Sequence, residues 1–235
     1  MLFKKSRKHL NDAIMRLVSE DQNAMSTENE PWVFTPALAS QIINKVFDME
    51  RRKSGRLVKC HMFAVAGLGT SGETQNPNIH DEDRILRLFH DLFEDTQLEP
   101  QDSLKWGIDY DTYQKINLLT RSEDKKSGAR EPYCDYIEIL SNDAECVDAK
   151  LDDAIDNLEF DPPNRNKQKL KKEVTICYLR AIQQSIISPG TSFKSFASQH
   201  PEHLPLGRTQ KEALKWINDN SSSLKNIGQW NYNHK

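Results

Sequence analysis

The stretch DEDRILRLFHDLFEDT, residues 81–96, decides the fold because its two faces differ sharply in polarity. Its apolar residues follow the spacing of an amphipathic helix and are Ile85, Leu88, Phe89, Leu92 and Phe93. The pattern predicts one helix over residues 81–94, with the acidic residues 81–83 favourably placed in its first turn. Four ionisable residues, 90, 91, 94 and 95, lie at the edge of the predicted buried face. Burying them is costly unless water, an ion pair or a metal ion satisfies them.

Helical spacing recurs along most of the chain. We expect further helices over residues 6–18, 36–54, 109–120, 132–142, 143–158, 167–187 and 208–219. The helix at 36–54 has Thr35 as its N-cap and Pro36 at its first position, and its predicted core residues are Leu38, Ile42, Val46 and Met49. Residues 56–69 are apolar, and their length fits a strand or a buried helix equally well. Because helical patterns dominate, the sequence predicts an all-α fold.

The composition excludes several classes of protein. The 235 residues carry a formal net charge of −3, which argues against general nucleic-acid binding. No apolar run is long enough to span a bilayer, and the N-terminal segment lacks the apolar core of a secretory signal. The four cysteines are scattered without a CxxC pair, which is typical of reduced thiols in a cytosolic protein. We therefore expect a cytoplasmic protein with neither a membrane nor a nucleic-acid partner.

A glycine-rich segment matches a nucleotide-binding motif by letter only. In GLGTSG, Gly67, Gly69 and Gly72 have the spacing of the dinucleotide fingerprint. That fingerprint requires a helix to begin at once, so that its N-terminus meets the pyrophosphate. Here ETQNPNIH follows, with Pro77 within it. The segment is therefore expected to be a flexible connection between helices.

Three segments carry side chains suited to metal binding. They contain His61 in the run LVKCHMFAVA, the neighbours His90 and Asp91, and Asp153 in AKLDDAIDNL. Two imidazoles and two carboxylates from three helices can hold one divalent ion such as Mn²⁺, Fe²⁺ or Zn²⁺. Such an ion lowers the pKa of a bound water and neutralises phosphate charge. Glu94 and Asp95, one turn beyond Asp91, are placed to handle the proton of that water.

Each segment also has a plainer interpretation. A buried histidine such as His61 is more often a hydrogen-bonded core residue, and an Asp-rich helix such as 150–157 is usually a solvated face. The predicted core residues of that helix are Leu151, Ile155 and Leu158. Asp153 and Asn157 lie four residues apart and share another face. It is the joint occurrence of the three segments that favours a metal site.

The order of these segments resembles a known enzyme family. The collinear blocks are RRKSGRLVKCHMFAVAGL (51–68), RLFHDLFEDTQLEPQDSLKWG (87–107), INLLTRS (116–122) and YIEILSNDAECVDAKLDDAIDNL (136–158). They resemble the HD-domain hydrolases of the RelA/SpoT type, which hydrolyse the alarmone (p)ppGpp. The resemblance covers roughly residues 35–180 and is sharpest in the HDxxEDT block and in the block with KLxD followed by asparagine.

The resemblance implies an all-α helical bundle with a Mn²⁺ site between helices. The activity it implies is removal of pyrophosphate from the 3′ position of guanosine tetra- or pentaphosphate, giving GDP or GTP. The implied metal ligands are His61, His90, Asp91 and Asp153. Glu94 and Asp95 match the pair that activates water, Arg52 and Lys53 match a basic pair that packs against the base, and Asn157 matches a substrate contact. Lys150 is a further cation available for the phosphates.

The chain also departs from the family pattern. Met62 follows the first histidine where the family often has proline, and Leu158-Glu159-Phe160 replaces the usual Met-Arg-Thr after the asparagine. The resemblance implies that the second change lies at the nucleoside end of the pocket. Two alternatives to a (p)ppGpp hydrolase therefore stay open: an HD phosphohydrolase acting on another nucleotide or phosphoester, and an inactive HD fold that serves as a binding module.

The domain organisation expected from these patterns has three parts. Residues 1–34 form an N-terminal helix and linker, 35–190 the HD phosphohydrolase domain, and 191–235 a polar extension with one helix. The last part is too short for a synthetase domain, so a hydrolase-only protein is expected. The expected partner is a nucleotide substrate, and nothing in the sequence indicates an oligomeric state.

Overall fold

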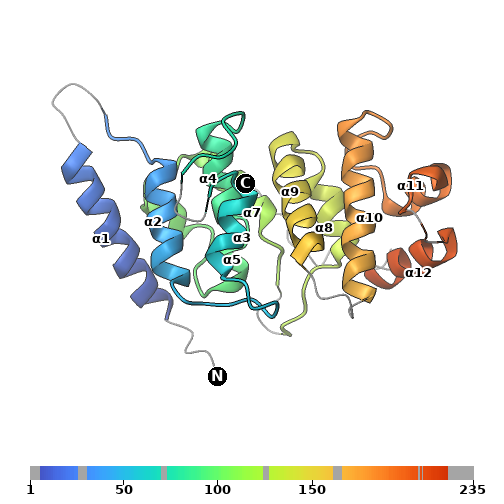
Figure 1. Ribbon diagram of the computed structural model, residues 1–235, viewed down its shortest axis with the longest axis horizontal. Coiled ribbons are helices and arrows are strands. Elements are labelled where there is room, and N and C mark those ends of the chain that lie inside the picture. The colour runs from blue at the N-terminus through green and yellow to red at the C-terminus, as the bar shows by residue number, and fades with distance from the viewer. Residues whose placement is uncertain are drawn as a thin grey trace. The chain divides into compact units, whose positions relative to one another are not determined.

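The computed structural model describes residues 6–25, 31–69, 73–123, 127–160, 166–205, 207 and 209–221. Over these ranges the fold is all-α, as predicted, with three isolated bridges and no β-strand. The chain forms two compact units, Met1–Thr120 and Arg121–Lys235 (Figure 1). Their boundary falls inside the segment 35–190 that the sequence assigns to one domain. No helix in the described ranges is both long and apolar enough to cross a membrane.

The first unit contains seven helices among its described residues. They are α1 (Arg7–Met25), α2 (Pro36–Phe47), α3 (Val58–Val65), α4 (Asp81–Phe89), α5 (Leu92–Asp95), α6 (Asp102–Lys105) and α7 (Tyr110–Leu119). The undecided segment 56–69 is therefore largely helical. The helix predicted over residues 6–18 is longer in the structure, because α1 continues to Met25. Helix α6 has no counterpart among the predicted elements.

Helix α2 ends earlier than the sequence suggests, and this changes its core face. Thr35 caps its N-terminus as predicted, its hydroxyl accepting a hydrogen bond from the backbone N–H of Leu38. The helix stops at Phe47, so Met49 lies outside it and is 68% exposed. Val46 is only half-buried. Ile43 and Phe47 are fully buried and belong to the core face of the helix. The predicted core positions Val46 and Met49 are therefore wrong.

Helix α1 is anchored to the rest of the first unit by polar as well as apolar contacts. Leu10, Ile14 and Val18 form its buried face, and α1 lies beside α2 (Figure 1). The guanidinium of Arg7 donates to both carboxylate oxygens of Asp102, at 2.8 and 3.0 Å. Burial alone raises the pKa of Asp102, but hydrogen bonds from Arg7, the Glu99 backbone and Lys105 outweigh it and hold the pKa well below its usual range.

The second unit is built around the pairing of its two longest helices. Its described elements are α8 (Tyr133–Leu140), α9 (Ala144–Phe160), α10 (Asn166–Gln183), α11 (Phe193–Gln199), the 3₁₀ helix η1 (Pro201–His203) and α12 (Gln210–Asn220). Helices α9 and α10 pack side by side, and α11 and α12 pack on each other (Figure 1). Helix α9 buries Leu151 as predicted, but Ile155 is 37% exposed, so its predicted core position is wrong.

The expected polar extension supplies part of the core of this unit. Helix α11, which was not predicted from the sequence, buries Phe193, Phe196 and Ala197. The Phe193 ring stacks on Tyr178 of α10 with centroids 4.0 Å apart. Helix α12, predicted at 208–219, starts with a capping box between Thr209 and Glu212. Helices α11 and α12 therefore pack as an integral part of the unit.

Candidate metal centre

His61 is presented by a short helix that follows a tight turn. The turn brings Arg51 opposite Leu57 and contains Gly55 at a φ of +90°, a conformation that favours glycine. Helix α3 begins at Val58, one residue after this turn, and places His61 in its first turn. The imidazole of His61 is completely buried. A buried imidazole needs a polar partner or a metal ion.

His90 and Asp91 lie at an interruption between two helices. The predicted single helix over 81–94 is wrong at this point, because α4 ends at Phe89 and α5 begins at Leu92. Asp91 adopts a φ of −108° and a ψ of −6°, which departs from helical geometry. The backbone hydrogen bond from Asp95 to Asp91 resumes the helical pattern. This break lets both side chains turn toward α3.

The hydrogen bonding of His90 fixes which of its nitrogens is available. Its Nδ1 lies 2.6 Å from the carbonyl oxygen of Arg87, which can only accept, so Nδ1 carries the proton. In the neutral ring, Nε2 then has a free lone pair, which is the form that binds a metal. Nε2 of His90 lies 3.0 Å from Nε2 of His61. The two ring nitrogens therefore converge on one point.

Asp91 adds a carboxylate oxygen to this pair. Its Oδ2 lies 3.2 Å from Nε2 of His90 and 3.5 Å from Nε2 of His61. Two ligands at about 2.1 Å from an octahedral ion stand about 3 Å apart, so these spacings fit three ligands of one ion. His61, His90 and Asp91 belong to a set of side chains that could hold a metal ion. We call these three residues the His–Asp triad.

Asp95 lies one turn beyond Asp91, on α5. Loss of hydration, followed by repulsion from Asp91 and Glu94, raises the pKa of Asp95 to about 6. The charges of His90 and Arg52 act in the opposite direction. A carboxylate with a pKa near 6 is a competent proton acceptor at neutral pH. Arg52, whose positive charge is close enough to act on Asp95, is half-buried, whereas Lys53 is exposed in the same turn.

Asp153 is held on one face of α9 in the second unit. It is 4% exposed, and its Oδ2 lies 2.7 Å from Nζ of Lys150. Its other oxygen accepts a hydrogen bond from the side-chain amide of Asn157. Lys172 of α10 donates to the backbone carbonyl of Asn157 at 3.0 Å. The predicted sharing of a face by Asp153 and Asn157 is thus confirmed, and Lys150 joins them.

An arginine that the sequence reading did not single out ties the two histidine-bearing helices together. Arg84 of α4 is 4% exposed and donates to the carbonyl oxygens of Ala66 at 2.9 Å and Ile79 at 2.8 Å. It also donates to Asn76 at 3.1 Å and Gly67 at 3.4 Å. Ala66 is the C-cap of α3, so Arg84 joins the end of α3 to the start of α4. The signal in the sequence was a basic residue next to the apolar stripe.

The glycine-rich segment ends a helix and does not begin one. Gly67 follows α3 at a φ of +65°, and a Cβ there would lie 2.7 Å from Cδ1 of Ile79. Leu68 and Thr74 form an isolated bridge, and the next helix begins only at Asp81. Gly72 lies outside the described residues. The nucleotide-fingerprint interpretation therefore lacks the helix that it needs.

The sequence-predicted residues are thus distributed over both units. The first unit brings together His61, His90 and Asp91, with Glu94, Asp95 and Arg52 close by; the second brings together Lys150, Asp153 and Asn157. No protein-family model matches the chain, and no curated protein matches it either. A functional proposal has to be argued from the chemistry of these residues.

Proposed function

We propose that this protein is a metal-dependent phosphohydrolase whose ion is bound by His61, His90, Asp91 and Asp153. The observation that carries the proposal is the convergence of the three ligand atoms of the His–Asp triad within 3.5 Å of one another. Asp153, a buried carboxylate of the second unit, is the proposed fourth ligand and completes a set of two imidazoles and two carboxylates. Mixed nitrogen and oxygen ligation suits Mn²⁺, and other divalent ions of similar size also fit it.

The chemistry follows from this donor set and its neighbours. A bound ion supplies Lewis acidity, which lowers the pKa of water and neutralises phosphate charge. Asp95, one turn beyond Asp91 on α5, accepts the proton from the attacking water, and Glu94 orients that water by hydrogen bonding. His90 is kept in the tautomer that offers Nε2 by its Nδ1 contact with the Arg87 carbonyl.

The proposed substrate is a guanosine 3′-diphosphate nucleotide, ppGpp or pppGpp. Support comes from the resemblance of the sequence blocks, and from basic side chains that can meet phosphates or the base: Arg52, Lys53 and Lys150. Asn157 supplies a side-chain amide that can donate a hydrogen bond to the substrate. Water attacks the phosphorus next to the 3′ oxygen and the bond to that oxygen breaks. The 3′ oxygen takes up a proton, and GDP or GTP leaves with pyrophosphate.

The first experiment measures pyrophosphate release from ppGpp by the purified protein, with and without added Mn²⁺, beside GTP, ATP and a simple phosphodiester. Mn²⁺-dependent conversion of ppGpp to GDP is the expected result. Cleavage of another compound alone keeps the metal chemistry and replaces the proposed substrate. An absence of turnover together with an absence of bound metal overturns the enzyme proposal and favours a binding module.

A matched pair of histidine variants separates the metal site from the fold. His90→Ala removes one ligand and is expected to lose both Mn²⁺ binding and turnover. His80→Ala removes an exposed imidazole from the same unit, outside the His–Asp triad, and is expected to change neither. Unchanged turnover in His90→Ala contradicts the proposed mechanism.

A further inference from the structure

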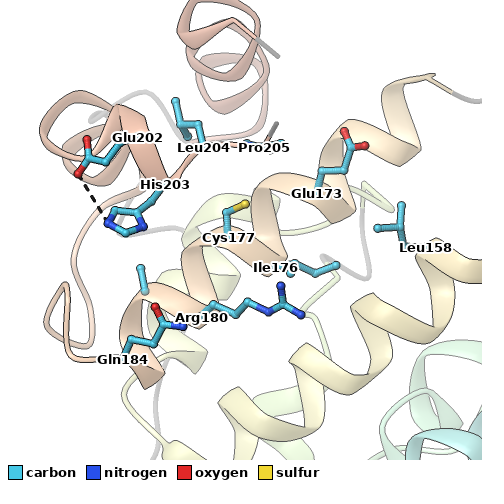
Figure 2. A pocket seen from close by; sticks show the side chains of 11 residues that line it. Leu158, Glu173, Ile176, Cys177, Arg180, Gln184, Glu202, His203, Leu204 and Pro205 are labelled. Atoms are coloured by element: carbon cyan, nitrogen blue, oxygen red, sulfur yellow. Dashed lines mark ion pairs between the residues drawn. The ribbon is translucent and has the colours of Figure 1, made fainter. Parts of the chain in front are cut away.

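The second unit contains a cavity that plays no part in the proposed metal chemistry. Its volume is about 500 Å³, which lies within the range of small-molecule sites. Most of one wall is a stripe of α10 side chains at helical spacing, from Glu173 to Arg180 and on to Gln184 just past the helix (Figure 2). The opposite wall is the segment 202–205, and Leu158 of α9 closes one side. All of these residues belong to one compact unit.

The interior of this cavity is apolar. Ile176, Ala181, Leu204 and Pro205 line it and are themselves buried. Helix α10 is packed against α9 and contacts η1, so the walls are fixed by the fold of the unit. An apolar cavity with fixed walls favours a ligand that has an apolar body, because such a ligand releases water on binding.

The charged side chains at the cavity differ in whether they already have partners. Glu173 lies 3.8 Å from Lys169, and Glu202 lies 3.6 Å from His200 and 3.7 Å from His203. Figure 2 shows the contact between Glu202 and His203. Within the part of the chain that the structure describes, the guanidinium of Arg180 has neither a hydrogen bond nor an ion pair.

Arg180 is an exposed residue at the cavity, and its charge is felt at Cys177. Burial raises the pKa of the Cys177 thiol, and the positive charge of Arg180 opposes that increase. Cys177 lies one turn before Arg180 on α10 and lines the same cavity (Figure 2). Arg180 therefore places a positive charge at the solvent-exposed edge of the apolar walls. Guanidinium groups bind carboxylates and phosphates through two parallel hydrogen bonds.

From this geometry we propose that the cavity binds a small amphipathic anion, with its head group on Arg180 and its apolar body against Ile176 and Leu204. Gln184, one turn beyond Arg180, is a further polar residue that lines the cavity. A carboxylate and a phosphate monoester share this chemistry. The site lies wholly within the second unit and does not depend on the metal chemistry proposed above.

Protection of Cys177 tests the proposal in the full-length protein. Alkylation of Cys177 by iodoacetamide is followed by mass spectrometry, with Cys60 of the first unit as an internal reference. The probes are octanoate, octyl phosphate, inorganic phosphate and the neutral octanamide. Octanoate or octyl phosphate is expected to slow alkylation of Cys177 about fivefold or more at saturation and to leave Cys60 unchanged. Whichever of the two is stronger identifies the head group.

Two substitutions decide whether Arg180 is responsible. Arg180→Gln is expected to weaken protection by the anionic probes about tenfold, the loss of one charge-assisted contact. Lys194→Gln removes the same charge from an exposed position of the unit outside the cavity and is expected to have no effect. Equal protection by octanamide, equal protection in Arg180→Gln, or no protection by either anionic probe overturns the proposal.

Discussion

Replacing Arg84 with methionine tests how the two histidine-bearing helices are held together. Methionine keeps much of the length of the side chain but has no donors. The carbonyls of Ala66 and Ile79, bonded at 2.9 and 2.8 Å, lose a charged partner in a buried setting. Each such bond contributes about 1.5 kcal/mol, so their loss costs about 3 kcal/mol. The contact with Asn76 adds little, because Asn76 is exposed and water can replace the lost donor. The contact with Gly67 adds little, because that carbonyl also accepts the backbone N–H groups of residues 75 and 76.

Hydrogen exchange resolved by peptide measures this cost where it arises. A loss of about 3 kcal/mol speeds exchange about 100-fold in peptides that open together with α3 and α4. Peptides from α9 and α10 are the internal reference, because the second unit contains none of the bonds that are lost. Arg84→Lys keeps the charge, but one ammonium reaches fewer of these carbonyls, so an intermediate effect is expected. An acceleration below about threefold in α3 would refute the reasoning.

Two other substitutions probe the proton acceptor and the anchoring of α1. Asp95→Asn is expected to lower kcat for the proposed reaction about 100-fold while Mn²⁺ content stays the same, as measured by turnover and metal analysis. Arg7→Met removes the principal partner of Asp102, whose folded-state pKa lies below its ordinary value near 3.8. The contribution of Asp102 is complete above that value and is lost as the pH falls, so Arg7→Met is expected to unfold at a higher pH than the parent in an acid titration followed by circular dichroism. Lys8→Met, an exposed neighbour, is the control and is expected to unfold as the parent does.

The helical content was predictable because each helix carries its own local signals. Thr35 and Pro36 mark the start of α2, and Asp109 caps α7 through the backbone N–H of Thr112. Helix ends were less predictable. Arg51 to Gly55 form a turn before α3, and this turn requires α2 to stop at Phe47, although the apolar spacing continues to Met49. The end of α2 therefore follows the turn that precedes α3 and not the apolar spacing of the helix.

The missed helix α11 had a readable start but a short apolar pattern. Ser192 caps it through the backbone N–H of Ser195, and Phe193 and Phe196 lie three residues apart. Seven residues give too few repeats to separate a helix from a polar loop by periodicity. Its stability comes from stacking on Tyr178, which lies fifteen residues earlier in the chain. Packing between residues this far apart cannot be predicted from a short stretch of sequence.

The candidate site was only partly predictable for a similar reason. The residue types of the His–Asp triad and the pairing of Asp153 with Asn157 followed from spacing and from the resemblance. The 3.0 Å separation of the two imidazoles did not, because it depends on how α3 packs against α4. Nor did the break after Phe89, since nothing in the apolar pattern interrupts the helix there. The polar pair His90-Asp91 occupies the break, and local rules often fail at functional sites.

The proposed set of four ligands takes residues from both units, so an ion that it bound would link the stabilities of the two units. Three of the proposed ligands belong to the first unit and Asp153 belongs to the second. An ion that binds only the folded site stabilises whatever must be folded to form that site, by about 2.7 kcal/mol at 100 times its dissociation constant. Mn²⁺ is therefore expected to slow hydrogen exchange in peptides of α3 and α4 and also in peptides of α9.

Asp153→Asn separates this linkage from binding by the first unit alone. The amide keeps the shape of the side chain but removes the charge that an ion requires. In this variant Mn²⁺ is expected to bind more weakly and, at saturation, to slow exchange in α3 and α4 only. Asp152→Asn changes the neighbouring carboxylate of the same helix and is expected to behave as the parent does. Undiminished Mn²⁺ protection of α9 in Asp153→Asn would show that Asp153 is not a ligand.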